Sequence, residues 1–392
     1  MKRIFSTIAL FAVVAAMAAD VPVQGFLNPR SWRRTRSKDF YSICEKTAAV
    51  KFNAPSTSSF YSVNYPIADC DENKCFEGIS FEVKGDGSSE WGTIAVFETN
   101  LICGQFYFPV SNKEWKEYRV AFADMTPASG LSLGLPASLP VKRITNLNFG
   151  DRWKLNWTNI KRKPFTYEVR NVKLIEKIDS VFVAGKYKSA RPLADVVKEM
   201  KAGKKVLVSC FGDSITAGTA LKRTDKRYAT LVGEMLVKKF NNANIKSECV
   251  AIGGAHTYDS LGWLQRDLTK GNPDVATMLI GYNNRSGGQS AELYRAQLEM
   301  WIERLLTKTN GKTAIILIPS IQGVPRWDAQ KDMAEMTYKV AKKYNCTICP
   351  IEQVIEKIGS KEYLKKYLAD AIHPNQAGHI IFAQELVKCF DK

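Results

Sequence analysis

The sequence has few histidines and few acidic residues. It contains three histidines, and 39 aspartates and glutamates against 56 lysines and arginines, so its 392 residues carry a formal charge of +17. No His, Asp and Glu residues fall at the spacing of a metal site, and no glycine loop of the form GxxxxGK[ST] is present. The sequence therefore predicts neither a metal nor another cofactor. A basic charge alone does not choose between nucleic acid, an anionic surface and an acidic polymer as partner.

Long apolar runs are absent after the first twenty residues, so no later segment is expected to anchor the chain in a membrane. The start of the chain has the form of a signal peptide, with Lys2 and Arg3 before an apolar stretch and a small-residue cleavage site ending at Ala18. An uncleaved anchor is the alternative, but the stretch is shorter than the ~20 residues of a membrane-spanning helix. We therefore expect residues 1–18 to be removed and the protein to be secreted or periplasmic. The remaining chain keeps a charge of +15.

The nine cysteines are an odd number, which leaves at least one free thiol in an exported protein. Cys70 and Cys75 flank a short polar stretch and are candidates for a disulfide. Cys346 and Cys349 have the CxxC spacing of a redox or zinc half-site, but no second CxxC and no neighbouring histidine complete it. A structural role, in packing or in a disulfide, is the favoured interpretation of the cysteines.

The chain is long enough for two domains at roughly 100–200 residues each, and its two halves differ in pattern. Residues 19–185 contain short alternating runs, such as Ile79–Lys84 and Tyr167–Leu174, separated by Gly, Pro, Asn and Ser. This alternation predicts an antiparallel β-sandwich. In pattern and position the segment resembles the jelly-roll modules that accompany carbohydrate-active domains.

Residues 186–392 alternate between apolar runs and helical spacing. Strands are expected at Lys204–Phe211, Ser247–Ile252, Val275–Ile280, Thr313–Ile318 and Thr347–Ile351, and helices at Tyr228–Phe240, Ser260–Leu268, Ser290–Leu306, Ala329–Tyr344, Glu362–Leu368 and Asn375–Cys389. Such alternation predicts a parallel sheet covered by helices on both faces, a flavodoxin-like α/β/α sandwich. Ligands of this class of fold gather at the carboxyl ends of the strands. The linker is expected around Ile178–Pro192.

Two short segments of the second half carry nucleophile and base chemistry. The first expected strand ends in Phe211–Gly218 (FGDSITAG), which places Ser214 at a strand-to-helix turn. Backbone N–H groups at such a turn point to the same space as the serine hydroxyl. Near the C-terminus, Asp370 and His373 are three residues apart, close enough for the carboxylate to orient the imidazole.

Four ordered blocks resemble those of the SGNH (GDSL) hydrolase superfamily. They are Gly212–Thr216 (GDSIT), Ala251–Thr257 (AIGGAHT), Gly281–Asn284 (GYNN) and Asp370–His379 (DAIHPNQAGH). The resemblance covers nearly half of the chain, from about Lys204 to Cys389. It implies an SGNH domain that hydrolyses carboxylic esters through an acyl-serine.

Carried over to this sequence, the resemblance implies Ser214 as nucleophile, His373 as general base and then acid, and Asp370 as the residue that orients His373. The oxyanion hole would comprise the backbone N–H groups of Ser214 and Gly254 and the side-chain amide of Asn283. Adjacent Gly253 is the alternative donor to Gly254. The third block has Asn284 where the family usually has Asp, and we expect Asn284 to act in loop hydrogen bonding.

The other polar residues of these blocks have less specific interpretations. His379 lies in the last expected helix, where a packing or surface role is favoured. His256 lies in the glycine block, and a loop hydrogen bond is favoured over substrate contact. Asp213, beside the nucleophile, is expected to stabilise the turn.

The substrate is expected to be an acylated polysaccharide or oligosaccharide. An exported hydrolase behind a β-sandwich most resembles the carbohydrate esterases of the superfamily, which remove acetyl groups. Tryptophans 91, 115, 153 and 157 of the first half are candidates for stacking on sugars, although tryptophan more often belongs to a core. Trp327 lies on a loop after the fourth strand and is expected to shape the pocket.

Basic clusters at Arg30–Arg36 and Lys161–Lys163 suit an anionic glycan, although a solvated basic face is the favoured alternative. Export and the lack of a reading motif argue against nucleic acid. Two rival functions remain: a lipase or phospholipid esterase, and a non-catalytic glycan-binding surface protein.

Overall fold

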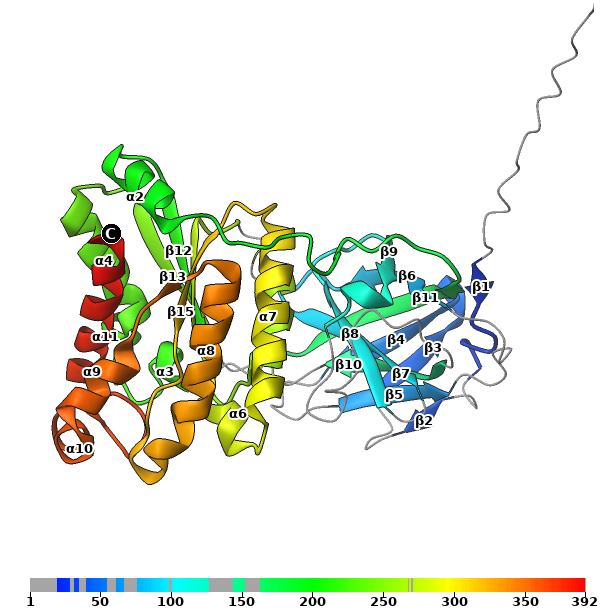
Figure 1. The fold of residues 1–392 in the computed structure, drawn as a ribbon. Helices are drawn as coiled ribbons and strands as arrows, with labels where there is room; N and C mark the ends of the chain where they lie inside the picture. Colours follow the sequence, from blue (N-terminus) through cyan, green and yellow to red (C-terminus); the bar gives the residue numbers. More distant parts are fainter. Residues whose placement is uncertain are drawn as a thin grey trace, which may run out of the picture.

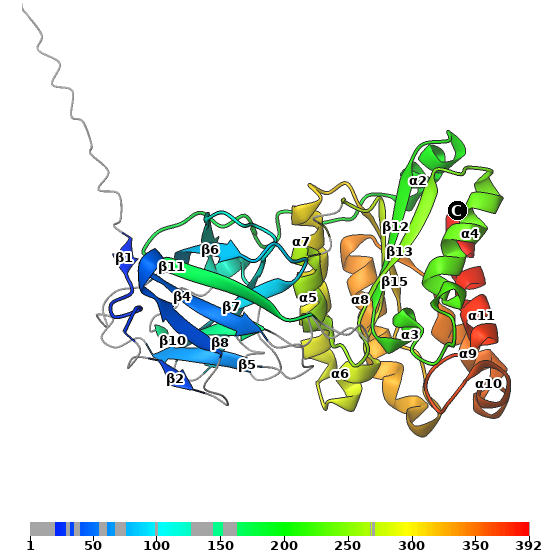
Figure 2. The same cartoon turned by 180° about the vertical axis from the view of Figure 1, so that it is seen from behind.

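The computed structural model describes residues 20–28, 32–34, 40–54, 61–66, 76–98, 101–126, 144–151, 163–266, 268 and 271–391. Antiparallel sheets form its first part, and a parallel sheet with helices on both faces forms its second part (Figures 1 and 2). The expected signal peptide, Cys70, Cys75, Trp153 and Trp157 lie outside the described residues, as do most of the basic clusters at 30–36 and 161–163.

Two antiparallel sheets make up the first part. One has the order β3 (Tyr41–Cys44), β4 (Ala49–Ala54), β11 (Phe165–Ile175), β6 (Gly78–Gly85) and β9 (Lys116–Ala121), with β1 (Val21–Pro22) beside β11. The other has the order β2 (Arg33–Arg34), β5 (Tyr61–Pro66), β10 (Ile144–Asp151), β7 (Trp91–Glu98) and β8 (Leu101–Pro109). Their facing side chains share one core rich in aromatic residues. Within it, Phe52 of β4 stacks on Phe149 of β10 and on Tyr167 of β11. The contact between Phe52 and Phe149 joins the two sheets.

The second part contains five parallel strands in the order β13 (Ile245–Ala251), β12 (Val206–Gly212), β14 (Val275–Leu279), β15 (Ala314–Ile318) and β16 (Thr347–Ile348). This order, 2-1-3-4-5 along the chain, is that of a flavodoxin-like sheet and confirms the expected α/β/α class. The helices are α2 (Leu193–Lys201), α3 (Ser214–Ala217), α4 (Tyr228–Phe240), α5 (Thr257–Arg266), α6 (Tyr282–Ser286), α7 (Ala291–Lys308), α8 (Lys331–Tyr344), α9 (Ile351–Ile358), α10 (Ser360–Tyr367) and α11 (Gln376–Lys388). Among the helices described, none is both long enough and apolar enough to cross a bilayer.

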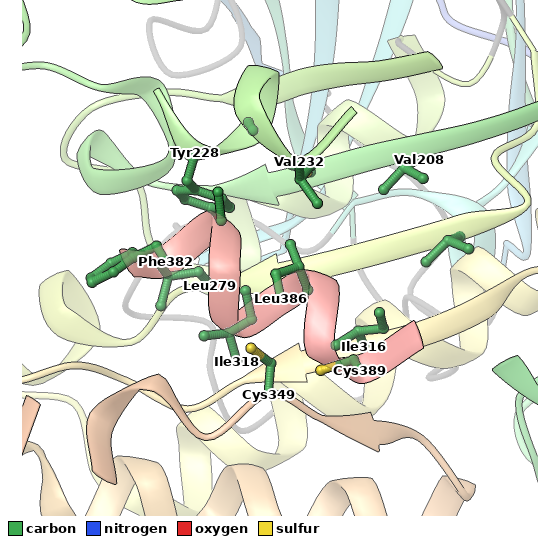
Figure 3. Close-up of a cluster of buried hydrophobic side chains, with 14 of the residues drawn as sticks. Val208, Tyr228, Val232, Leu279, Ile316, Ile318, Cys349, Phe382, Leu386 and Cys389 are labelled. Atoms are coloured by element: carbon green, nitrogen blue, oxygen red, sulfur yellow. The ribbon is translucent and has the colours of Figure 1, made fainter. Parts of the chain in front are cut away.

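Alternate residues of the parallel strands enter two different cores, as the period of a strand requires. Val208 and Cys210 of β12 pack under α4 and α11, whereas Phe211 packs under α5, α7 and α8. Figure 3 shows the first of these cores, with Tyr228, Phe382 and Leu386 meeting the sheet. Both faces of the sheet are therefore buried, and the carboxyl ends of the strands remain as the place for a site.

Three helices were not expected from the sequence: the short α6, α2 and α9. α2 follows the expected linker, and α9 begins at Ile351, where a strand was predicted. Only Thr347 and Ile348 pair as a strand there, with β15. The apolar side chains of α9, such as Ile351 and Ile355, pack into the first core.

Most of the tryptophans and cysteines that the structure describes have packing roles. Trp91 packs against the core under α5 and α7, and the Arg170 guanidinium lies 4.0 Å from the Trp115 ring centre. Trp327 meets Tyr363 edge-on. Cys346 belongs to one core and Cys349 to the other, so the two thiols of the CxxC segment lie on opposite faces of the sheet. This arrangement contradicts a redox or zinc half-site and confirms the structural interpretation.

Candidate active site

Ser214 begins α3 directly after β12. Asp213 precedes it as N-cap, and its Oδ1 accepts a hydrogen bond of 3.0 Å from the backbone N–H of Ile215. At Gly212 a Cβ would lie 2.0 Å from Thr216 Oγ1 and 2.6 Å from the Leu279 carbonyl oxygen. Only glycine therefore allows the strand to turn this tightly into the helix, which holds Ser214 at the carboxyl edge of the sheet.

Asp370 and His373 lie on the loop between α10 and α11. The Asp370 Oδ1 accepts hydrogen bonds of 2.7 Å from the backbone N–H groups of Ile372 and His373. Its Oδ2 lies 2.8 Å from His373 Nδ1, and His373 Nε2 lies 3.0 Å from Ser214 Oγ. The structure thus joins the three predicted residues, from segments 159 positions apart, in one hydrogen-bonded chain.

The charge of Asp370 fixes the direction of the hydrogen bonds that join Asp370, His373 and Ser214. Burial favours the neutral form of Asp370, but hydrogen bonds from the backbone and ring of His373 and from Ile372 outweigh it and hold the pKa of Asp370 below its ordinary value. An ionised carboxylate only accepts hydrogen bonds, so His373 Nδ1 donates to it. A neutral imidazole then has Nε2 left to accept the Ser214 hydroxyl proton.

Backbone hydrogen bonds fasten the His373 loop at several points. Ala369 N–H donates to the His373 carbonyl at 2.8 Å, and Val324 N–H donates to the Ala371 carbonyl at 3.0 Å. Asn375 caps α11 by accepting from Gly378 N–H at 3.1 Å. The imidazole is therefore positioned by its own loop and by the segment that follows β15.

Two glycines lie on the other side of Ser214. Ala255 N–H donates to the Ile252 carbonyl at 3.2 Å, which closes a turn with Gly254 at φ +71°. A Cβ at Gly253 would come within 3.7 Å of Ser214 Cβ, so this turn lies directly against the nucleophile. Both candidate oxyanion glycines are thus brought to the site.

Asn283, on α6 after β14, also reaches the site. Its Nδ2 donates to the Ala255 carbonyl oxygen at 3.1 Å and to Asp213 Oδ2 at 3.3 Å. The two bonds use both amide hydrogens and tie together the loops that follow β12, β13 and β14. An oxyanion at Asn283 would therefore replace or share the longer bond, the one to Asp213.

Burial raises the pKa of Asp213 to about 6, because desolvation outweighs its backbone hydrogen bonds and the charge of His373. The predicted turn-stabilising role of Asp213 is confirmed by its bond to Ile215, but its contact with Asn283 was not anticipated. Only the adjacency of Asp213 to Ser214 hinted at this contact, because the sequence does not show which loops meet.

The remaining predictions for this region concern supporting residues. Asn284 is fully buried and makes four side-chain hydrogen bonds, to Thr257 N–H and Oγ1, Gln289 and Gln297, which confirms its loop role. His379 is buried, accepts from Tyr228 N–H at 3.2 Å and has its pKa lowered to about 4 by burial. Its predicted packing role is confirmed. His256 stacks on Tyr258, and its backbone N–H donates to Asp259.

Within the described residues, no group of three or more His, Cys, Asp or Glu side chains is arranged to hold a metal ion. The free thiols described are Cys44, Cys210, Cys249, Cys346, Cys349 and Cys389. Burial raises the pKa of Cys210 to about 12 and that of Cys249 to about 11. Nucleophile chemistry at neutral pH is therefore assigned to the serine and not to these two thiols.

Comparison with known proteins identifies the second part of the chain. The model of the GDSL-like Lipase/Acylhydrolase family matches residues 210–381. No curated protein sequence matches the chain.

Three solved structures are similar to part of this chain. A putative GDSL-like lipase from Parabacteroides merdae is 19% identical, with a TM-score of 0.43, over 48% of this chain and 96% of that one. A two-domain esterase active on acetylated mannans is 24% identical, with a TM-score of 0.43, over 51% and 53%. A variant of an acetyl xylan esterase from Geobacillus stearothermophilus is 19% identical, with a TM-score of 0.40, over 47% and 94%.

Proposed function

Residues 210–381 belong to the GDSL-like lipase/acylhydrolase family, a family of carboxylic ester hydrolases, and on this premise we propose that the protein is an exported serine esterase that removes O-acetyl groups from a polysaccharide. The observation that carries the proposal is the hydrogen-bonded chain from Asp370 through His373 to the Ser214 hydroxyl. It supplies a base within reach of the nucleophile and a carboxylate that orients the base.

In the proposed first step, Ser214 Oγ attacks the acetyl carbonyl carbon while His373 Nε2 takes the hydroxyl proton. Asp370 stabilises the imidazolium that forms. The backbone N–H groups of Ser214 and Gly254 and the Asn283 amide bind the oxyanion, each contributing on the order of 3 kcal/mol to transition-state binding. When the intermediate collapses, the C–O bond to the sugar breaks and His373 protonates the departing sugar hydroxyl.

In the second step, water attacks the acyl-Ser214 carbonyl. His373 Nε2 takes a proton from the water and returns it to Ser214 Oγ when the ester bond to the serine breaks. Acetate leaves and the enzyme regains its starting state. This sequence needs no group beyond the residues named and one water molecule.

The carbohydrate substrate is supported by the setting of the domain. The N-terminal residues have the pattern of a signal peptide, which would place the enzyme outside the cytoplasm with extracellular or cell-surface glycans. The basic mature chain favours an anionic acetylated glycan, because opposite charge raises the local substrate concentration.

We assign the N-terminal sheets to the jelly-roll class, because their strand orders are β4-β11-β6-β9 and β5-β10-β7-β8, and from β4 to β11 the chain crosses between the two sheets at every connection except the one from β7 to β8. In the proposed enzyme this domain packs against the esterase domain and supports it. Its strand β8 packs on α5, and the Tyr107 backbone N–H donates to Gln265 of that helix at 3.2 Å. α5 begins two residues after Ala255, the last residue of the glycine turn at Ser214.

The test compares the full mature chain with Ser214→Ala on acetylated oligosaccharides and on acyl esters of increasing chain length. We expect acetate release that the substitution lowers by at least about 10³-fold. A preference for long acyl chains would favour a lipase instead. No turnover of any ester, with retained glycan binding, would identify a non-catalytic binding protein and contradict the proposal.

A further inference from the structure

Two buried cysteines meet in the core under α4 and α11. Cys349 directly follows β16, and its backbone N–H donates to the Leu317 carbonyl oxygen of β15 at 3.0 Å. Cys389 directly follows α11 and begins the short 3₁₀ helix η8 (Cys389–Asp391). Cys349 is fully buried and Cys389 is 6% exposed. The proposed ester chemistry uses neither thiol.

The two thiols contact each other. Figure 3 shows both side chains between the end of α11 and the segment after β16. The Cys389 Sγ lies 3.7 Å from the carbonyl oxygen of Ile348, the residue before Cys349. The hydrogen bond with the Cys389 thiol, together with burial, raises the pKa of the Cys349 thiol well above its ordinary value. Thiols in contact reach the sulfur–sulfur distance of a disulfide, about 2 Å, by rotation about their Cα–Cβ bonds.

The other thiols described in this domain are directed to other partners. Cys210 and Cys249 are paired in register on β12 and β13. However, Cys210 hydrogen-bonds to the Thr277 side chain, and Cys249 Sγ donates to the Thr216 carbonyl oxygen at 3.5 Å. Cys346 packs on the opposite face of the sheet. Among the thiols described, the geometry therefore selects the pair at the end of α11.

The compartment decides whether such a pair stays reduced. In a reducing compartment, a buried cysteine behaves as a small apolar residue. In an oxidising compartment, adjacent thiols form disulfides, which persist there. Export is part of the proposed function, so the pair would meet an oxidising environment while the chain folds. Zinc, another partner of paired thiolates, takes three or four protein ligands, and the described residues contain no group of three that could hold a metal ion.

We propose that Cys349 and Cys389 form a disulfide bond in the exported protein. This inference rests on the export that the proposed function includes. The two thiols lose two protons and two electrons when the bond forms. The oxidant is a second disulfide, carried by a thiol–disulfide oxidoreductase or by glutathione, and it is reduced to two thiols. One cysteine thiolate attacks it to give a mixed disulfide, and the other cysteine thiolate then displaces the remaining thiol.

The bond closes a covalent loop around the part of the chain that carries the base. Residues 349–389 include α9, α10, the loop with Asp370 and His373, and α11. A cross-link over roughly 40 residues stabilises a fold mainly by restricting the unfolded chain. Cys389 lies at the end of α11 that is opposite to the His373 loop. The bond should therefore raise the stability of the domain and leave the ester chemistry unchanged.

The test maps the pairing in a Cys346→Ser background, because residues 346 and 349 share the tryptic peptide 344–357. The mature chain is denatured, reduced and refolded in a buffer of glutathione and glutathione disulfide. A second preparation is exported to the periplasm of a bacterial host and needs no refolding. Remaining thiols are blocked with N-ethylmaleimide, and tryptic peptides are identified by mass spectrometry. We expect residues 344–357 to be linked to residues 389–392, and Cys389→Ser to abolish this link.

Thermal unfolding and activity provide the second measurement. The same chain refolded in dithiothreitol is the control of identical sequence. We expect the oxidised form to melt about 10 °C higher than the reduced form. The Cys389→Ser chain, treated in the same two ways, should lose most of this difference. We expect kcat/KM for p-nitrophenyl acetate, measured well below the melting temperature, to differ less than twofold between the oxidised and reduced forms.

The outcomes separate the disulfide from the esterase. Recovery of residues 389–392 only in the alkylated form in both preparations, or linked to another cysteine, would overturn the disulfide even if the esterase is active. An oxidised form that melts no higher than the reduced form would overturn its stabilising role. A cross-linked protein that hydrolyses no ester would overturn the esterase and leave the disulfide supported.

Discussion

At the scale of single residues, Asp213 stands out because a carboxyl group is buried next to the nucleophile. Its Oδ2 accepts the weaker of the two Asn283 amide bonds, and burial raises its pKa to about 6 from an ordinary value of 3.8. The folded state therefore binds the proton more tightly than the unfolded state. The stability from this group is fully present below about pH 4 and is lost as the pH rises through about 6.

Asp213→Asn tests this linkage, because an amide does not titrate. Relative to wild type, the variant should gain unfolding free energy between pH 4 and pH 8, by about 2–3 kcal/mol. Urea unfolding at the two pH values measures the change. We also expect kcat to fall, since the Asn283 amide would face an NH₂ group. A stability difference that is independent of pH would contradict the prediction.

The three residues of the hydrogen-bonded chain were predicted because the blocks around Ser214 and around Asp370 and His373 resemble those of the SGNH superfamily, and their positions after a strand end and three residues apart agree with that resemblance. The contact of Asp213 with Asn283 was not, since it joins segments 70 residues apart through one amide. Long-range polar contacts leave no periodic trace in a sequence.

At the scale of elements, the loops that follow β12, β13 and β14 of the parallel sheet each carry one part of the candidate active site. Gly281 lies in one of these loops, as the N-cap of α6, and has a φ of +134°. A Cβ there would lie 2.8 Å from Ser320 Cβ and 2.9 Å from Ser320 Oγ. The turn thus places Asn283 at the site.

Gly281→Ala should shift α6 and with it Asn283. We expect kcat/KM for p-nitrophenyl acetate to fall about 10- to 100-fold, and the unfolding free energy to fall by about 1–3 kcal/mol. Gly203→Ala is the control, because φ is +73° there and no atom lies within 4 Å of the added Cβ. The control should lose stability without losing activity. Equal activity of the two variants would show that α6 does not depend on this turn.

Most helices and strands of the second half followed from periodicity, and the predicted bounds of α4 coincide with those observed. α2 was missed although Leu193, Val196, Val197 and Met200 have helical spacing after a proline, a signal that was available. α9 was missed because the apolar run before it resembles a buried strand, and length alone separates the two.

At the scale of the whole molecule, the antiparallel sheets and the esterase domain meet along α5 and α7 (Figures 1 and 2). Arg304 of α7 donates to the backbone carbonyls of Ala123, Asp124 and Met125, at 2.8 to 2.9 Å, and its guanidinium lies 4.7 Å from the Phe182 ring centre. The Asp124 carboxylate accepts from Ser180 and from the Val181 and Phe182 N–H groups. Arg304 thus holds the antiparallel part of the chain against α7, and Asp124 holds the segment that joins the two parts.

Arg304→Met should uncouple the two parts, because it leaves three carbonyl groups without their donor. A donor lost from a buried acceptor costs about 1–3 kcal/mol, which is large against the stability of a domain. We expect wild type to unfold in one calorimetric transition and the variant in two, with faster proteolysis around residues 176–192. Arg295→Met, at an exposed position of the same helix, is the control. If Arg304→Met keeps a single transition at the wild-type temperature, the contact does not couple the domains, and the proposed buttress on α5 would have to rest on the packing of β8 alone.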